Sequence, residues 1–251
     1  MPQANVQFSD DEDEFRLVTR LTTNKREIRQ ALELRYRVFA EDMGASVQGA
    51  DLGIDQDRFD EYCMHLIVKD EISDRVVGYS RILTNELATR AGGYYSATEF
   101  DLSNVLKPGK TYMEIGRTCI DLNFRCGAAI GHVWRFLTDY MEEHQIDYLM
   151  GCCSIPITDG FGRINAVMDY LSEKHFTPDD QRAIPKIAIP SIKNDIEGKR
   201  FVPSLLKAYL RMGVLICGDA YHDRDFGVAD ALILLKREDL NHRYIERLLR
   251  E

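Results

Sequence analysis

The chain has 251 residues, of which 45% are apolar and 29% are charged, a composition that excludes a largely disordered protein. Its 41 acidic residues outnumber its 32 Lys and Arg residues, giving a formal net charge of −9. This balance argues against a nucleic-acid binder, which needs a basic surface to neutralise phosphates. Since no apolar run has the length that spans a bilayer, and no signal-peptide core follows Met1, we expect a cytoplasmic protein.

Six cysteines are scattered over the chain without the paired CxxC spacing of a structural zinc site. Cys152 and Cys153 stand together in an apolar run, where cysteine usually acts as a small hydrophobic residue. The six histidines show no HxxxH or HxH spacing either. The sequence therefore predicts no metal site and no permanently bound cofactor.

The N-terminal part of the chain contains an acidic segment, then a predicted strand and a predicted helix. Residues 1–14 finish in a block of acidic residues and are predicted to form a disordered tail, with one domain over 15–251. Alternation over 15–20 predicts a strand, and Asn24 with Glu27 fits a capping box that starts a helix reaching Met43. Arg35 falls inside the apolar stripe of this helix. There a long cation either extends to the edge or meets an anion in a cleft.

The remainder of the chain alternates between strand and helix patterns. Residues 44–61 and 86–110 are predicted to be irregular. Apolar alternation predicts further strands over 64–69, 76–83, 112–121, 147–154, 214–218 and 229–236. Periodicity predicts helices that end at 144, cover 162–174 and 204–212, and close the chain. The strand–helix–strand unit over 112–154 predicts parallel pairing, so the fold class is a single mixed α/β (α+β) domain.

A loop of small residues precedes the central helix. Arg125, Gly127 and Ala128 belong to this loop, where backbone amides can approach an anion and the helix dipole adds positive charge. Such a loop suits the phosphate of a nucleotide or of a pantetheine cofactor. A tight strand–helix connection with no ligand explains it equally, because neither a Walker nor a GxGxxG pattern is present.

Two charged residues stand three apart in the strand over 112–121. Glu114 and Arg117 would face opposite sides of a regular strand, but a bulge at Gly116 would place both on one face. A carboxylate and a guanidinium in one cleft could orient an amine and accept its proton. The alternatives are a structural ion pair or two independent surface charges.

A third group of charged residues comes from separate elements, namely Arg35, Asp57, Asp60 and Arg81. Together they would suit a zwitterionic small molecule, with arginines on its carboxylate and aspartates on its ammonium. Spacing alone leaves open whether the four side chains converge.

The order of elements resembles the fold of GCN5-related N-acyltransferases (GNAT). The Arg35-x-x-x-Phe39 helix, Asp57 and Asp60, Arg81, and the strand Glu114–Arg117 resemble the signature of acyl-homoserine-lactone synthases. Ala45 departs from this signature, because that family has a tryptophan there. The segments 151–154, 203–213 and 223–230 are similar to a neighbouring branch, the hemolysin-like ornithine-lipid N-acyltransferases.

The resemblance implies a mixed, mostly antiparallel sheet flanked by helices, with splayed central strands. It also implies transfer of a 3-hydroxyacyl chain from acyl carrier protein to the α-amine of ornithine, with an acyl-phosphopantetheine thioester as co-substrate. Glu114 and Arg117 would then be catalytic. Residues in the other roles would be Arg35, Phe39, Asp57, Asp60 and Arg81 for the amino acid, and Arg125, Gly127 and Ala128 for the acyl donor.

An acidic carrier protein needs local positive charge on this acidic chain. Residues 182–211 contain seven Lys or Arg residues and two acidic ones, a net charge of +5. Lys207 and Arg211 stand four apart on one helix face, so we expect this region to dock the carrier. An ordinary solvated surface is the alternative.

Two other functions remain open. The first is an N-acyl amino acid or acyl-homoserine-lactone synthase with another acceptor; the lactone option needs S-adenosylmethionine and is disfavoured by Ala45. The second is a non-catalytic acyl-carrier or lipid-binding protein, against which the presence of both Glu114 and Arg117 argues. A peripheral contact with the inner membrane, where the product would go, is a further expectation.

Overall fold

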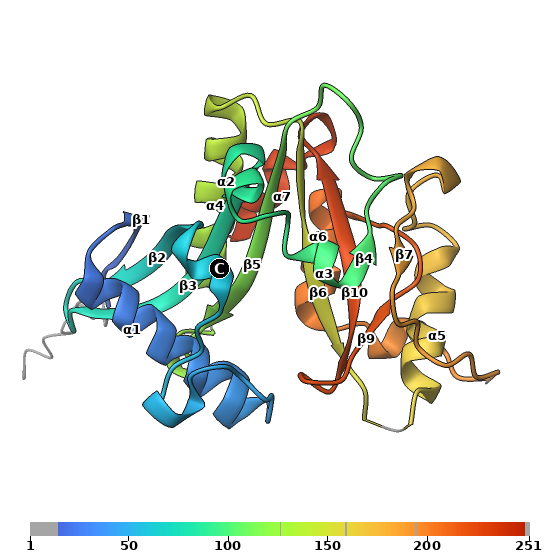
Figure 1. Cartoon of the computed structure of the whole chain (residues 1–251), viewed down its shortest axis with the longest axis horizontal. Helices are drawn as coiled ribbons and strands as arrows, with labels where there is room; N and C mark the ends of the chain where they lie inside the picture. Colours follow the sequence, from blue (N-terminus) through green and yellow to red (C-terminus); the bar gives the residue numbers. More distant parts are fainter. Residues whose placement is uncertain (1–14, 126, 159, 194, 249–251) are drawn as a thin grey trace, which may run out of the picture.

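The computed structural model describes residues 15–125, 127–158, 160–193 and 195–248; the predicted acidic tail over 1–14 lies outside this range. One eight-stranded sheet organises the chain (Figure 1). In spatial order its strands are β1 (Leu17–Thr22), β2 (Met64–Asp70), β3 (Arg75–Thr84), β5 (Tyr112–Ile120), β6 (Tyr148–Pro156), β10 (Val228–Lys236) and β8 (Leu215–Ile216), with β9 (Tyr221–Asp223) also on β10. Apart from the β5–β6 pair, these neighbours are antiparallel. This confirms the predicted mixed, mostly antiparallel sheet.

Helices cover both faces of the sheet. On one face α1 (Lys25–Tyr36) packs Ala31 and Leu34 against Tyr79 and continues as a π-helix, η1 (Arg37–Asp42). On the other face α4 (Ala128–Glu143) packs Trp134 against a core that includes Ile115. The two layers bury the sheet's apolar side chains from both directions. Any opening between the strands therefore leads from the α1 face to the α4 face.

The remaining elements are short, or lie at the β10 side of the sheet. They are α2 (Asn85–Arg90), α3 (Ser96–Glu99), β4 (Phe100–Asp101), β7 (Ile184–Pro185), α5 (Gly162–Ser172), α6 (Ser204–Met212) and α7 (His242–Leu248), with four-residue or shorter 3-10 turns between. The helix predicted over 204–212 is confirmed at both ends. The segment 86–110, which we expected to be irregular, contains α2, α3 and β4, so that expectation was wrong.

The start of α1 differs from the predicted capping box. Asn24 caps the helix by accepting from the backbone N–H of Arg26 at 2.9 Å. Glu27 does not complete the box, because its carboxylate accepts from the Thr22 hydroxyl at 2.6 Å and from Arg20 at 2.6 Å. The side chain therefore ties the helix to the end of β1.

The central strands β5 and β6 separate after a short parallel ladder. Their pairing runs from Tyr112 with Tyr148 to Glu114 with Met150, and the described ladder stops there. A Cβ on Gly151 would lie 2.5 Å from the carbonyl oxygen of Ile115, so only glycine permits the close approach at this point. Figure 1 shows the two strands diverging beyond it. The predicted parallel unit and the predicted splay are both confirmed.

A bulge interrupts β5 directly after Gly116. Tyr79 pairs with Cys119 and Arg81 with Gly116, so two residues of β5 stand opposite one residue of β3. Arg117 is one of these two and has a φ of 52°, a left-handed conformation that costs a non-glycine residue about 1–2 kcal/mol. The bulge expected at Gly116 is thus present, with the additional residue just beyond the glycine.

Candidate active site

A cavity of about 570 Å³ opens where β5 and β6 separate. It is lined from both faces of the sheet, so it passes through the gap between the two strands. Its side toward α4 and α6 is apolar and includes Ile130, Trp134, Tyr209, Met212 and Ile233. Its side toward α1 and α3 contains the charged residues Arg81, Arg117, Asp223 and Asp230, together with Tyr95 and apolar residues such as Phe39 and Phe226, and we call it the polar side. A molecule with an apolar tail and a charged head fits such a cavity.

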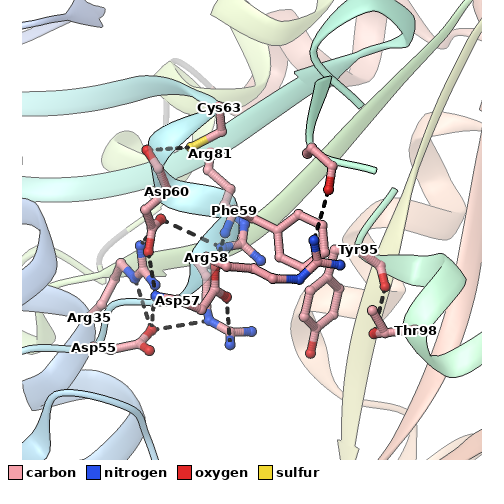
Figure 2. A network of polar contacts seen from close by, with 12 residues as sticks. Arg35, Asp55, Asp57, Arg58, Phe59, Asp60, Cys63, Arg81, Tyr95 and Thr98 are labelled. Atoms are coloured by element: carbon pink, nitrogen blue, oxygen red, sulfur yellow. Dashed lines mark hydrogen bonds and ion pairs between the residues drawn. The ribbon is translucent and has the colours of Figure 1, made fainter. Parts of the chain in front are cut away.

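Arg35 is fully buried in a network of charges on the polar side (Figure 2). Its guanidinium lies 2.6 Å from Asp60 and 2.8 Å from Asp55. The cation on the inward face of α1 thus meets anions rather than extending to the edge. The charge of Arg35 is held by protein carboxylates, as a buried charge requires.

Arg81 and Arg117 complete the network. Arg81 pairs with Asp57 at 2.6 Å (Figure 2). Arg117 lies 3.1 Å from Asp55 and 3.3 Å from Asp57. Burial opposes ionisation of Asp57, but Arg81 and Arg117 hold the pKa of this carboxyl below its ordinary value. Three arginines therefore face three aspartates, and each of these aspartates is paired with at least one of the protein's own cations.

The predicted acceptor-binding residues converge, but only some of them reach the cavity. Arg81 and Phe39 line it, whereas Arg35, Asp57 and Asp60 are absent from its described lining. Asp57 and Asp60, which we expected to bind an ammonium, are both paired with arginines of the protein. Arg81 lines the cavity, and its buried Nη2 has no hydrogen-bond partner among the described residues. This atom is a donor available to an anion in the cavity.

Glu114 is sealed from the cavity. Its carboxylate accepts from the backbone N–H groups of Tyr95 and Ser96, each at 2.7 Å, and from the Ser96 hydroxyl at 2.6 Å. It is 3% exposed and absent from the described lining, and burial raises the pKa of this carboxyl. The expectation of a base in direct contact with substrate does not fit this position. The contacts instead fix the start of α3 against β5.

Arg117 faces the cavity beside two aromatic rings. Its guanidinium carbon lies 5.2 Å from the centre of the Tyr95 ring and 4.9 Å from that of Phe226. The Phe226 ring in turn contacts Phe39 edge-on, with 5.9 Å between centres. Arg117 thus has one ionic and one aromatic set of contacts, which hold its side chain in one orientation.

A second group of charges lies at the polar side of the cavity. Oxygens of Glu99, Asp223 and Asp230, all buried, lie within 4.8 Å of one another. Among the described residues these three could hold a metal ion or another cation. Burial, reinforced by the neighbouring carboxylates, raises the pKa values of Glu99 and Asp230. We call these three residues the carboxylate trio.

The donor loop lies at the rim of the same cavity. Arg125 and Gly127 line it, and Ala128 begins α4, while Cys126 lies outside the described residues. Arg125 donates to the carbonyl oxygen of Ile120 at 3.0 Å and lies 3.0 Å from Asp42. Gly127 has a φ of 108°, which turns the chain into the helix.

The predicted docking region includes one wall of the cavity. Ser204, Leu205 and Ala208 of α6 line it, and Lys207 and Arg211 stand on the same helix. Arg182 pairs with Asp179, which lies just outside the region, and Arg200 pairs with Glu197 within it. Lys207 and Arg211 thus belong to the helix of the docking region that lines the cavity.

The fold and this cavity define an acyltransferase of the GNAT class. A family model described as an acetyltransferase (GNAT) domain matches residues 34–135. The AHL synthase LasI has a similar fold, with 13% identity, a TM-score of 0.53 and coverage of 89% of this chain and 91% of LasI. TofI, solved with an inhibitor, gives 11% identity, a TM-score of 0.55 and coverage of 92% and 96%.

Curated relatives define the family within that class. An L-ornithine N(alpha)-acyltransferase of Brucella abortus is 32% identical over 251 residues, covering 91% of this chain and 87% of the relative. The protein of the same name from Agrobacterium fabrum is 30% identical over 249 residues, covering 91% and 84%. The chain belongs to the family of L-ornithine N(alpha)-acyltransferases and is an amide-forming N-acyltransferase.

Sequence reasoning missed several residues of this site. Asp55 stands two residues before Asp57 in the same acidic loop, so the loop's composition was the available signal. Asp223 and Asp230 were noted as part of a family-like segment but given no role. Glu99 had no usable signal, because it lies in a segment without periodicity.

Proposed function

We propose that this enzyme transfers a 3-hydroxyacyl chain from acyl carrier protein to the α-amine of L-ornithine, forming a lyso-ornithine lipid. The names of the curated relatives support ornithine as the acceptor. The observation that carries the proposal is the cavity that passes through the sheet, apolar on one face and charged on the other. The product has the same division, with an alkyl tail and a charged amino-acid head.

The acyl tail lies on the α4 and α6 side in this proposal. Trp134, Tyr209 and Met212 offer apolar surface there, and burying each methylene of the chain contributes about 0.8 kcal/mol. The thioester carbonyl then lies in the gap between β5 and β6. Past Glu114 the described ladder no longer joins β5 to β6, so strand amides facing the gap are suited to stabilise an oxyanion.

The amino acid lies on the opposite, polar side. The unpartnered Nη2 of Arg81 and the guanidinium of Arg117 suit its carboxylate. Arg35, Asp57 and Asp60 act one step further out, because their ion pairs hold Arg81 and Arg117 in place. Phe39 completes the wall through its contact with Phe226.

The reaction needs few groups from the protein. The deprotonated α-amine attacks the thioester carbonyl, the C–S bond breaks as the amide forms, and the thiol of the carrier leaves with a proton. A thiol is a good leaving group, so no covalent enzyme intermediate is needed. Glu114 contributes by fixing Tyr95 at the edge of the cavity, and Arg117 contributes by orienting the acceptor.

The donor approaches along the rim of the cavity. Arg125, Gly127 and the first residue of α4, Ala128, suit the phosphate of the phosphopantetheine arm. Lys207 and Arg211 offer positive charge to the acidic carrier protein beside the wall that α6 contributes. These assignments make the acyl-phosphopantetheine thioester the co-substrate.

The product is an amphiphile, so a peripheral contact with the inner membrane belongs to the proposal. None of the helices in the described residues has the length and apolar character needed to cross a bilayer. Exposed apolar residues on the docking region, including Ile184 and Leu205, are suited to such a contact.

Acyl transfer with purified components tests the proposal. The enzyme is incubated with a 3-hydroxyacyl carrier protein and, separately, with L-ornithine, other amino acids or S-adenosylmethionine, and the products are measured by mass spectrometry. We expect N-acylornithine. Amide formation only with another amino acid would replace ornithine as the acceptor, and a lactone from S-adenosylmethionine would indicate a homoserine-lactone synthase. Carrier binding without any turnover would indicate a binding protein.

A further inference from the structure

We propose that the carboxylate trio of Glu99, Asp223 and Asp230 binds the second ammonium group of a diamino acid acceptor. This inference rests on the proposed function and deepens it, because it names the residues by which the enzyme would select ornithine over neutral amino acids. The trio lies outside the motifs on which the sequence resemblance to lactone synthases was based. Its position in the cavity, its internal contacts and its charge carry the argument.

The first observation is where the trio lies. Asp223 and Asp230 both line the cavity, on the side that also holds Arg81 and Arg117, and Glu99, which is absent from the described lining, lies within 4.8 Å of both. A diamino acid bound on this side would place its carboxylate against Arg81 or Arg117 and its second ammonium against the carboxylate trio. The polar side of the cavity thus offers one anion site and one cation site.

The second observation is an unsatisfied atom. Asp223 accepts from the backbone N–H groups of Asp225 and Phe226, at 2.9 and 3.0 Å, and Asp230 accepts from the Ser154 hydroxyl at 2.7 Å. Glu99 is 3% exposed, yet its Oε2 has no hydrogen-bond partner within the described part of the chain. A buried acceptor of this kind is costly, and an ammonium donor entering the trio would satisfy it.

The third observation is the balance of charge. Arg117 is the cation whose charge acts on Asp230, and Arg117 is itself paired with Asp55 and Asp57. The other titratable groups that act on the trio are Tyr95, Cys152 and Tyr221. Within the described ranges of the chain no Lys, Arg or His side chain forms an ion pair with the trio, unlike the three aspartates of the arginine network, and a bound ammonium would supply the missing positive charge.

The charge state of the trio also predicts a proton balance. Burial raises the pKa values of Glu99 and Asp230, so the empty trio retains a proton that a free carboxylate would have lost. An incoming ammonium brings its own positive charge and releases that proton to the solvent. Binding of ornithine is therefore expected to release a proton that binding of L-norvaline, which lacks the second amine, does not.

The test compares ornithine and norvaline on the wild type, Asp230→Asn and Glu99→Gln. Binding is measured by calorimetry in buffers of different ionisation enthalpy, and kcat/KM is measured separately for each acceptor. We expect either substitution to lower the affinity and kcat/KM for ornithine about 10- to 100-fold and to leave those for norvaline unchanged. In both variants the binding of ornithine should no longer release a proton.

Asp225→Asn is the matched control, since Asp225 is exposed in the turn that follows Asp223, and this variant should behave as the wild type. An unchanged ornithine-to-norvaline ratio in both variants would overturn the inference, as would an equal loss of kcat for both acceptors, which would make the trio the proton acceptor. Stabilisation of the wild type, but not of Asp230→Asn, by Mg²⁺ or Ca²⁺ would replace it by a metal site. Wild-type binding of ornithine through the trio without acyl transfer would instead refute only the proposed function.

Discussion

Glu114 and Arg117 contact the same residue, Tyr95, from two directions. Glu114 accepts from the Tyr95 backbone N–H at 2.7 Å, and the Arg117 guanidinium carbon lies 5.2 Å from the centre of the Tyr95 ring. The bulge after Gly116 makes this arrangement possible, because Arg117 is one of its two residues and has a left-handed backbone that breaks the regular alternation of the strand. The pair is thus joined through Tyr95 at the wall of the cavity.

The first prediction concerns Glu114. Its carboxylate accepts three hydrogen bonds, so Glu114→Gln places an NH₂ group against N–H donors and should lower the free energy of unfolding by about 1–3 kcal/mol. Activity should fall mainly through a higher KM for the acceptor. Chemical denaturation and steady-state kinetics measure the two effects. The control is Ser96→Ala, which removes only the hydroxyl donor and should lower the free energy of unfolding by less. If Glu114→Gln instead kept its stability and had a 100-fold lower kcat, Glu114 would be the general base.

Arg117 provides the second prediction. Arg117→Lys removes the paired N–H donors while keeping the charge, and should raise the KM for the amino acid about tenfold with little change in kcat. The control is Arg58→Lys, because Arg58 belongs to the neighbouring loop, donates to the carbonyl oxygen of Ala91, and is absent from the described lining of the cavity. Kinetics with ornithine as the varied substrate are the measurement. An equal effect of the two substitutions would show that Arg117 acts through the fold alone.

The apolar side of the cavity gives a third prediction. Ala208→Phe adds a ring to the wall that α6 contributes and should shift the preferred acyl donor toward shorter chains. Each methylene that no longer fits costs about 0.8 kcal/mol, or about a fourfold change in KM for the donor. A series of acyl-carrier donors of increasing length measures the shift. Leu210→Phe, on the same helix but outside the described lining, should leave the preference unchanged.

Carrier docking is the subject of the fourth prediction. Reversing Lys207 and Arg211 to glutamate should raise the KM for acyl-carrier protein about tenfold and weaken its dependence on salt. Turnover of a small acyl-pantetheine donor should not change, because this donor has no carrier protein to contact Lys207 and Arg211. The control reverses Lys25 and Arg90, two exposed basic residues on other helices. Equal KM values for the carrier in both double variants would contradict the docking proposal.

The carboxylate trio gives a prediction about stability and pH. Because the pKa of Glu99 is raised in the folded state by burial and by Asp230, the folded protein holds a proton that the unfolded chain loses. The free energy of unfolding should therefore fall as pH rises above about 4.5, the ordinary pKa of a glutamate. In Glu99→Gln this fall should be smaller, which urea denaturation across pH 5 to 8 can measure. If the free energy of unfolding of Glu99→Gln changed with pH as steeply as that of the wild type, a group other than Glu99 would be responsible for the pH dependence.

Local signals in the sequence were sufficient where the chain's own chemistry sets the structure. Pro203 and Gly213 bound the helix α6, and Gly116 indicated the irregularity in β5. The short elements over 86–110 could not be predicted this way, because α3 begins where Glu114, eighteen residues from Ser96, accepts its first N–H groups. Contacts of that kind depend on tertiary packing, which outweighs local propensity.

The candidate site was predictable in composition but not in pairing. The residue types and their elements were visible for Arg35, Asp57, Asp60 and Arg81, and the structure brings them together. What the spacing could not show is that the aspartates neutralise the arginines, because an ion pair between Arg35 and Asp60 spans twenty-five residues of chain. The same holds for the trio, because Glu99 is more than a hundred residues away in the sequence from Asp223 and Asp230, which lie on the adjacent strands β9 and β10.

The passage of the cavity through the sheet affects the end of the reaction cycle. In the proposed reaction two separate molecules would occupy the two faces before the amide bond forms, and each could leave from its own side. Afterwards one product molecule would extend across both faces, and either its charged head or its tail would have to pass between β5 and β6 to leave the enzyme. We therefore expect departure of the lipid, rather than amide formation, to limit turnover, and small changes in strand separation to alter the rate of that departure.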